Sequence, residues 1–111
     1  MKSKNLKLVV MLMLMGSAFT VLAKNVVLEI KVHGQCGECK ERIEKALDKP
    51  GITYASWDVT SKMLTVKFND KKYSEDDIHK ILNGIGYNTE KSKASNDQIN
   101  KLPACCRPGG H

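Results

Sequence analysis

The chain has 111 residues with 18 basic and 12 acidic side chains, and its formal net charge is +6. A chain of this length has room for one small domain with a modest core, so a second domain is not expected. Acidic and basic residues are interleaved, and no basic block carries the aromatic residues that nucleic-acid binding favours. We therefore expect no nucleic-acid partner.

The first residues have the pattern of a secretory signal peptide. Lys2, Lys4 and Lys7 precede an apolar run over residues 8–22, and the run ends in a small-residue cleavage site at Ala23. The run is shorter than the ~20 residues that a membrane-spanning helix needs. We expect residues 1–23 to be cleaved after Ala23. The mature protein is then periplasmic or secreted, with no membrane attachment.

The next two elements are a strand and a helix, joined by a pair of cysteines. Apolar residues occupy every second position of residues 26–33, which predicts a strand with one buried face. From Glu38 the apolar spacing becomes helical, and Pro50-Gly51 ends this helix. Cys36 and Cys39 therefore lie in the loop at the start of the first helix.

The rest of the domain predicts a hairpin, a second helix and a short last strand. Residues 55–59 and 64–68 alternate around a turn at residues 60–62. Ser74 and the three acids after it start a helix whose apolar stripe runs to residue 85. Residues 87–90 can add a strand at the sheet edge. The order βαββαβ predicts an α+β, ferredoxin-like sandwich, with a four-stranded antiparallel sheet and two helices on one face.

The Cys-x-x-Cys pair predicts soft-metal chemistry. At a helix start, free N–H groups and the positive end of the helix dipole stabilise Cys36 and Cys39 as thiolates. Two sulfurs can hold Cu(I) or Hg(II) in a near-linear arrangement, whereas Zn(II) requires about four ligands. We expect the pair at the surface, where the metal can pass to another protein by ligand exchange. The alternative is a structural disulfide between the two.

The C-terminal tail adds two more thiols, Cys105 and Cys106, and an imidazole at His111. The residues between 90 and 100 can span about 30 Å when extended, which lets the tail fold back to the first loop. We hypothesise that Cys105 or Cys106 supplies a third or fourth sulfur, in one molecule or between two. Disulfides of the tail cysteines are the rival interpretation. We expect His33 to be a solvated residue at the rim, and His111, as the last residue, to be frayed rather than a ligand.

The element order and the Cys36–Cys39 pair resemble the heavy-metal-associated domain family, which includes copper chaperones, soft-metal domains of metal-transporting ATPases and periplasmic mercury-binding proteins. The resemblance covers about residues 26–91 and includes the Pro50-Gly51-Ile52 turn and the Gly86-Tyr87 pair. It implies a metal-binding domain over residues 24–91, followed by a polar linker and Cys-Cys tail over residues 92–111. It also implies that Tyr87 lies close to the metal loop, although a core tyrosine is an equal alternative.

These observations predict an exported protein that is not an enzyme. It sequesters Cu(I), or Hg(II) or Zn(II), or delivers it to a metal-transporting ATPase or another envelope acceptor. The expected metal ligands are Cys36, Cys39, Cys105 and Cys106, in a monomer or a metal-bridged dimer. The alternative is a thiol-disulfide oxidoreductase or a redox-sensing dithiol protein.

Overall fold

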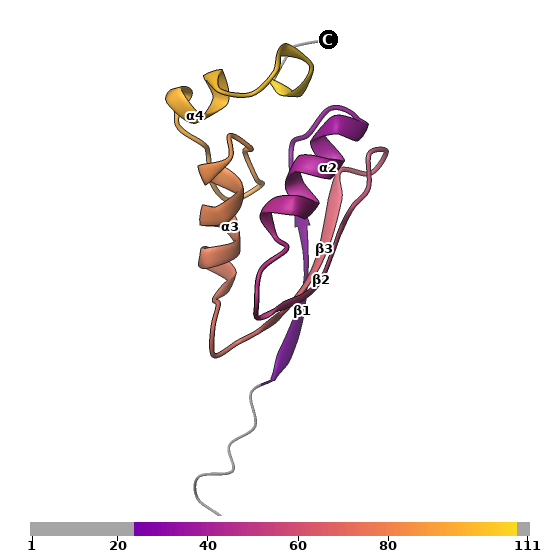
Figure 1. Ribbon diagram of the computed structural model, residues 1–111, viewed down its shortest axis with the longest axis vertical. Coiled ribbons are helices and arrows are strands. Elements are labelled where there is room, and N and C mark those ends of the chain that lie inside the picture. Colours follow the sequence, from indigo (N-terminus) through magenta and orange to yellow (C-terminus); the bar gives the residue numbers. More distant parts are fainter. Residues whose placement is uncertain (1–23, 109–111) are drawn as a thin grey trace, which may run out of the picture.

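The computed structural model describes residues 24–108, which form a three-stranded antiparallel sheet with two main helices on one side and a short helix after them (Figure 1). The strands are arranged in the order β1-β3-β2. The elements along the chain are β1 (Asn25–Lys31), α2 (Gly37–Ala46), β2 (Ile52–Trp57), β3 (Met63–Asn69), α3 (Glu75–Gly84), α4 (Asn96–Asn100) and the 3-10 helix η1 (Ala104–Cys106). The predicted first strand, both helices and the hairpin are confirmed.

The sheet buries one face, as the alternating pattern predicts. β3 is the central strand and pairs with both neighbours, so that Leu64 lies opposite Ile30 of β1 and Trp57 of β2. All three side chains are buried in the same core. β2 begins directly after Gly51, and its register against β3 shifts between Ile52 and Tyr54. This arrangement places the last residue of β2, Trp57, below the cysteine loop.

The two main helices begin at the positions that the sequence indicates. Cys36 is the N-terminal cap residue of α2. Ser74 caps α3 in a reciprocal capping box with Asp77, which satisfies two backbone N–H groups at the helix start. Each helix turns an apolar stripe toward the sheet. The buried helix residues are Cys39 and Ile43 on α2, and Ile78, His79 and Leu82 on α3.

The fourth strand that the sequence predicts is reduced to a single bridge, between Val32 and Thr89. The amide of His33 still donates to the carbonyl of Asn88 at 2.9 Å. The amide of Glu90 also donates to the carbonyl of Lys31 at 3.1 Å, which completes the bridge. The chain then turns back on itself, since the Thr89 amide donates to the carbonyl of Ser92 at 2.8 Å. The described sheet therefore has three strands, and the predicted fourth strand is not confirmed beyond this bridge.

The tail packs back onto the domain instead of extending away from it. Figure 1 shows α4 and the segment after it crossing the ends of α3 and α2. Leu102 is 4% exposed and belongs to the main core, together with Cys106. Gly86, at φ +97°, allows this approach because a Cβ there would lie 2.7 Å from the Gln98 carbonyl oxygen. The tail is therefore part of the domain's packing.

Two expectations fall outside the described residues: the signal peptide over residues 1–23, and the role of His111. Within residues 24–108, every helix is too short or too polar to span a bilayer.

Candidate metal centre

The cysteine loop is held in place by Trp57 at the end of β2. A Cβ on Gly34 would lie 2.7 Å from Cζ2 of the Trp57 ring, so only glycine allows the loop to pass this closely. The indole Nε1–H lies 3.1 Å from the carbonyl oxygens of both Val32 and Lys62. The ring therefore ties the end of β1 to the hairpin turn directly beneath the loop.

The start of α2 is fixed to the same strand by two charged side chains. The Trp57 amide donates to the Glu44 carboxylate at 2.9 Å, and Lys40 Nζ donates to the Trp57 carbonyl at 3.1 Å. Lys40 and Glu44 also form an ion pair one turn apart on α2. These contacts use both backbone groups of Trp57, and so they set the position of α2 and its cysteines against the sheet.

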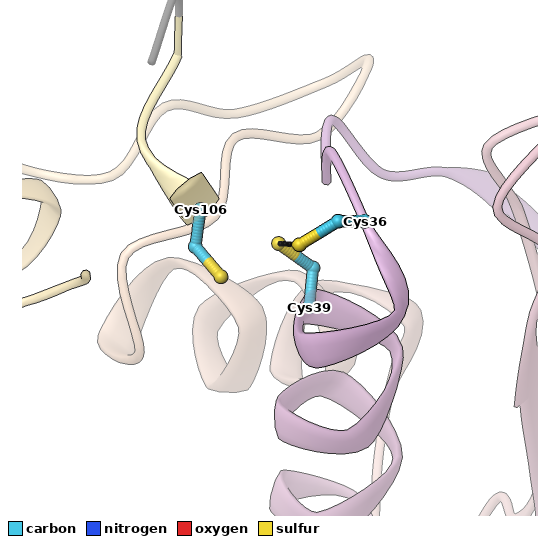
Figure 2. Close-up of side chains that lie close together, drawn as sticks. All are labelled: Cys36, Cys39 and Cys106. Atoms are coloured by element: carbon cyan, nitrogen blue, oxygen red, sulfur yellow. Dashed lines mark hydrogen bonds between the residues drawn. The ribbon is translucent and has the colours of Figure 1, made fainter. Parts of the chain in front are cut away.

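Three sulfur atoms meet at the start of α2 (Figure 2). The Sγ atoms of Cys36 and Cys39 are 3.8 Å apart. Cys106 points toward them from η1, and all three sulfurs lie within 4.8 Å of one another. The structure thus brings one of the two predicted tail cysteines to the Cys-x-x-Cys pair within a single chain.

The pair is less exposed than the sequence analysis expected. Cys36 is half-buried, whereas Cys39 and Cys106 are both 0% exposed. Cys39 is covered because it lies one turn before Ile43 on the apolar face of α2, and because the tail closes over it. Only Cys36 gives this sulfur cluster a side toward solvent, so the expectation of a surface pair was wrong for Cys39.

The spacing of the sulfurs suits a metal with more than two ligands. Two sulfurs bound to one ion at ~2.3 Å lie ~4.6 Å apart in a linear arrangement and ~3.8 Å apart in a tetrahedral one. The Cys36–Cys39 distance of 3.8 Å matches the bent arrangement. The three sulfurs lie close enough together for Cys106 to serve as a third ligand beside the pair.

The cluster favours one thiolate beside a protonated thiol. Burial would raise the pKa of Cys39, but interactions with Cys106 and Tyr87 and with the Gln35 and Cys36 backbone outweigh burial, and its pKa is lowered. Burial, and then the neighbouring Cys39, raise the pKa of Cys106. Of these two thiols, Cys39 therefore loses its proton more readily than Cys106 does.

Tyr87 completes the buried side of the cluster. Its hydroxyl is buried and has no hydrogen bond of good geometry within residues 24–108. Burial, and then the Cys39 and Cys106 thiols, raise the pKa of Tyr87. The side chain is thus both a core tyrosine and a neighbour of the cluster, so the two alternatives drawn from the sequence are compatible.

Cys105 lies outside this cluster. Its thiol donates to Oε2 of Glu38 at 3.2 Å and lies 3.8 Å from the Cys106 sulfur. This contact with Glu38, and then partial burial, raise the pKa of Cys105. Sequence reasoning did not single out Glu38, although an acid between the two cysteines of the loop was a visible signal. His33 is exposed, as expected.

A small α+β domain with two cysteines at the start of its first helix has the form of a soft-metal-binding domain. The sequence pattern of the heavy-metal-associated domain matches residues 29–88, more than half of the chain. The chain belongs to this family.

Known proteins of this kind include ATPases and small binding proteins. A copper-exporting P-type ATPase of Staphylococcus saprophyticus is 34% identical over 71 residues, which are 64% of this chain and 9% of the ATPase. The N-terminal domain of a potential copper-translocating P-type ATPase from Bacillus subtilis, solved in the Cu(I)-loaded state, is 29% identical with a TM-score of 0.56; the match covers 60% of this chain and 85% of that domain. Oxidized MerP from Ralstonia metallidurans CH34 shares the fold at 23% identity and a TM-score of 0.56, over 60% of this chain and 96% of MerP.

Proposed function

We propose that this protein is an exported Cu(I)-binding protein that holds the ion between Cys36, Cys39 and Cys106 and delivers it to an acceptor in the cell envelope. The observation that carries this proposal is the convergence of three cysteine sulfurs within 4.8 Å at the N-terminus of α2. Thiolates are soft ligands, and soft ligands select Cu(I) over the hard cations. Membership of the heavy-metal-associated family supports metal binding.

The choice of Cu(I) rests on the ligand set and on the relatives. Within residues 24–108 the site offers three sulfurs and no imidazole, a set that suits Cu(I), whereas Zn(II) requires about one ligand more. The printed names of two relatives refer to copper export and to a Cu(I)-loaded state. Hg(II) and Zn(II) are the competing cargoes. Binding at Cys106 would displace its thiol proton, because only the thiolate is a metal ligand.

Delivery to an acceptor follows from the one exposed side of the cluster. Cys36 is half-buried, while Cys39 and Cys106 are covered. An acceptor thiol can therefore approach the ion beside Cys36 and replace one sulfur at a time, so that the ion is never released to water. A metal-transporting ATPase with a similar domain is a suitable acceptor. The basic and apolar pattern of residues 1–22, with Ala23 as the cleavage site, supports export.

The test is an anaerobic titration of the reduced protein with Cu(I), Hg(II) and Zn(II) against a competing chelator. We expect one tightly bound Cu(I) at the three-sulfur site, and we expect the double variant Cys36→Ser, Cys39→Ser to lose it. If the protein takes none of the three metals from the chelator, the proposal is overturned.

A dithiol redox function is the second candidate, because Cys36 and Cys39 are free thiols with sulfurs 3.8 Å apart. Closing a disulfide between them would need only a short movement. An insulin-reduction assay separates the two functions. Turnover comparable to that of a dithiol enzyme, together with no metal binding, would favour the redox function.

A further inference from the structure

A second group of metal-ligand side chains lies next to the three-sulfur site. Glu38, Cys105 and Cys106 offer a carboxylate oxygen and two sulfurs, all within 4.8 Å of one another. Cys105 Sγ is 3.2 Å from Glu38 Oε2 and 3.8 Å from Cys106 Sγ. Cys106 therefore belongs to two overlapping sets of three ligands.

The local structure explains why the adjacent cysteines serve different sets. Both are in the short 3-10 helix η1, where neighbouring side chains point in different directions. Cys106 points inward and is fully buried, whereas Cys105 is half-buried and faces Glu38 at the start of α2. In this arrangement Cys105 is not part of the inner set, and its thiol contacts the Glu38 carboxylate and the Cys106 sulfur.

We propose that Glu38, Cys105 and Cys106 form a second metal site for a borderline divalent cation of the Zn(II) class, with the Cys106 thiolate bridging it to the inner Cu(I). The bridge rests on the proposed function, because it requires an ion at Cys36 and Cys39 as well. A four-coordinate ion at this site would take its fourth ligand from water.

The ligand set and its spacing select this class of metal. Two sulfurs and a carboxylate oxygen form a mixed soft and hard set, which Zn(II) accepts and Cu(I) does not favour. The Cys105 and Cys106 sulfurs are 3.8 Å apart, which is close enough for both to bind one ion. Glu38 is exposed, and its other oxygen, Oε1, lies 3.6 Å from Arg42. Arg42 thereby holds the carboxylate while Oε2 faces the thiol.

When a cation binds at the outer site, the Cys105 thiol releases its proton. The hydrogen of Cys105 that now points to Glu38 leaves as the Cys105–metal bond forms, and the Cys106 proton has already left when the inner ion bound. No electron is transferred, so the step needs no oxidant or reductant. The outer ion offsets part of the negative charge that accumulates when all the thiols are deprotonated.

Co(II) provides an optical probe for this site, because its bonds to thiolates absorb in the near ultraviolet. The reduced protein is first loaded with one equivalent of Cu(I), its copper content is measured, and Co(II) is then added. We expect one further equivalent to bind with a sulfur-to-cobalt band. We expect Cys105→Ser and Glu38→Gln to weaken Co(II) binding by about tenfold or more. The matched control is Glu41→Gln, an exposed acid on the same helix, and it should bind Co(II) as the unaltered protein does.

Two results would overturn the proposal: no Co(II) binding by the copper-loaded protein, or equal Co(II) binding by the Cys105→Ser, Glu38→Gln and unaltered proteins. Titrating the copper-free protein separates failure of this site from failure of the inner one. Co(II) binding that depends on Cys105 and Glu38, in a protein that takes up no Cu(I), would support the outer ligand set and overturn the bridge.

Discussion

The sulfur of Cys106, near the end of the described chain, lies within 4.8 Å of the sulfur of Cys39 at the start of the first described helix. Both side chains are fully buried. The contact exists because Leu102 enters the core and Gly86 lets the tail approach closely. The tail is thus positioned to complete the proposed metal site of its own chain, which is the basis of the predictions below.

Replacing Cys106 by serine should weaken Cu(I) binding by at least about tenfold, because the hydroxyl of serine is a poor ligand for a soft ion. Competition against a Cu(I) chelator measures the change. Ala104→Ser, an exposed position in the same 3-10 helix, serves as the control and should bind Cu(I) unchanged. Equal affinities for all three proteins would remove Cys106 from the site.

Replacing Gly34 by alanine should destabilise the domain by about 1–3 kcal/mol, because the added methyl group meets the Trp57 ring at 2.7 Å. In a domain of this size each kcal/mol lowers the melting temperature by about 4–8 °C. Gly37→Ala is the matched control, since a Cβ there has no neighbour within 4 Å and alanine favours the helix. Thermal unfolding of both variants checks the prediction, and a Gly34→Ala protein as stable as Gly37→Ala would contradict it.

Replacing Gly86 by alanine should loosen the tail. The residue has φ +97°, which alanine adopts only with strain, and a Cβ would lie 2.9 Å from the Leu102 side chain. Cys106 should then react faster with a thiol-alkylating reagent, as followed by mass spectrometry. Gly84→Ala is the control, because a Cβ at that position meets nothing within 4 Å. Unaltered alkylation of Cys106 in the Gly86→Ala protein would show that the tail is anchored elsewhere.

Metal binding should change the fluorescence of Trp57, the single tryptophan of the chain. A Cβ on Gly34 would lie 2.7 Å from the Trp57 ring and 3.2 Å from Cβ of Cys39, so the ring lies next to the metal loop. We expect quenching that saturates at one equivalent of Cu(I) and is absent from the Cys36→Ser, Cys39→Ser double variant. The same quenching in that variant would mean that the ion binds at another place.

The sequence predicted the parts of the fold that have strong local signals. The stripe of α3 and its cap at Ser74 are both visible in the sequence, and α3 lies where they predict it. The predicted fourth strand is reduced to one bridge, because a turn between Thr89 and Ser92 follows it. Apolar periodicity does not reveal this turn. The helix α4 was missed because it is short, although Ser95 caps it and was a visible start signal.

Only the Cys36–Cys39 part of the candidate site could be predicted from the sequence. The spacing of Cys36 and Cys39 at a helix start indicated two thiols at one place, and the structure places their sulfurs 3.8 Å apart. Which of the tail cysteines joins them depends on the direction of each side chain in η1, and no pattern in the sequence specifies it. Glu38 was missed because its partner, Cys105, is remote in the chain.

The most direct test of the account is X-ray absorption spectroscopy at the copper edge on protein loaded with one equivalent of Cu(I). Because Cys36, Cys39 and Cys106 converge, we expect three sulfur neighbours around the ion in the unaltered protein and two in Cys106→Ser. Two sulfur neighbours in both proteins would contradict the account, since the tail would then contribute no ligand and the Cys-x-x-Cys pair would hold the ion alone.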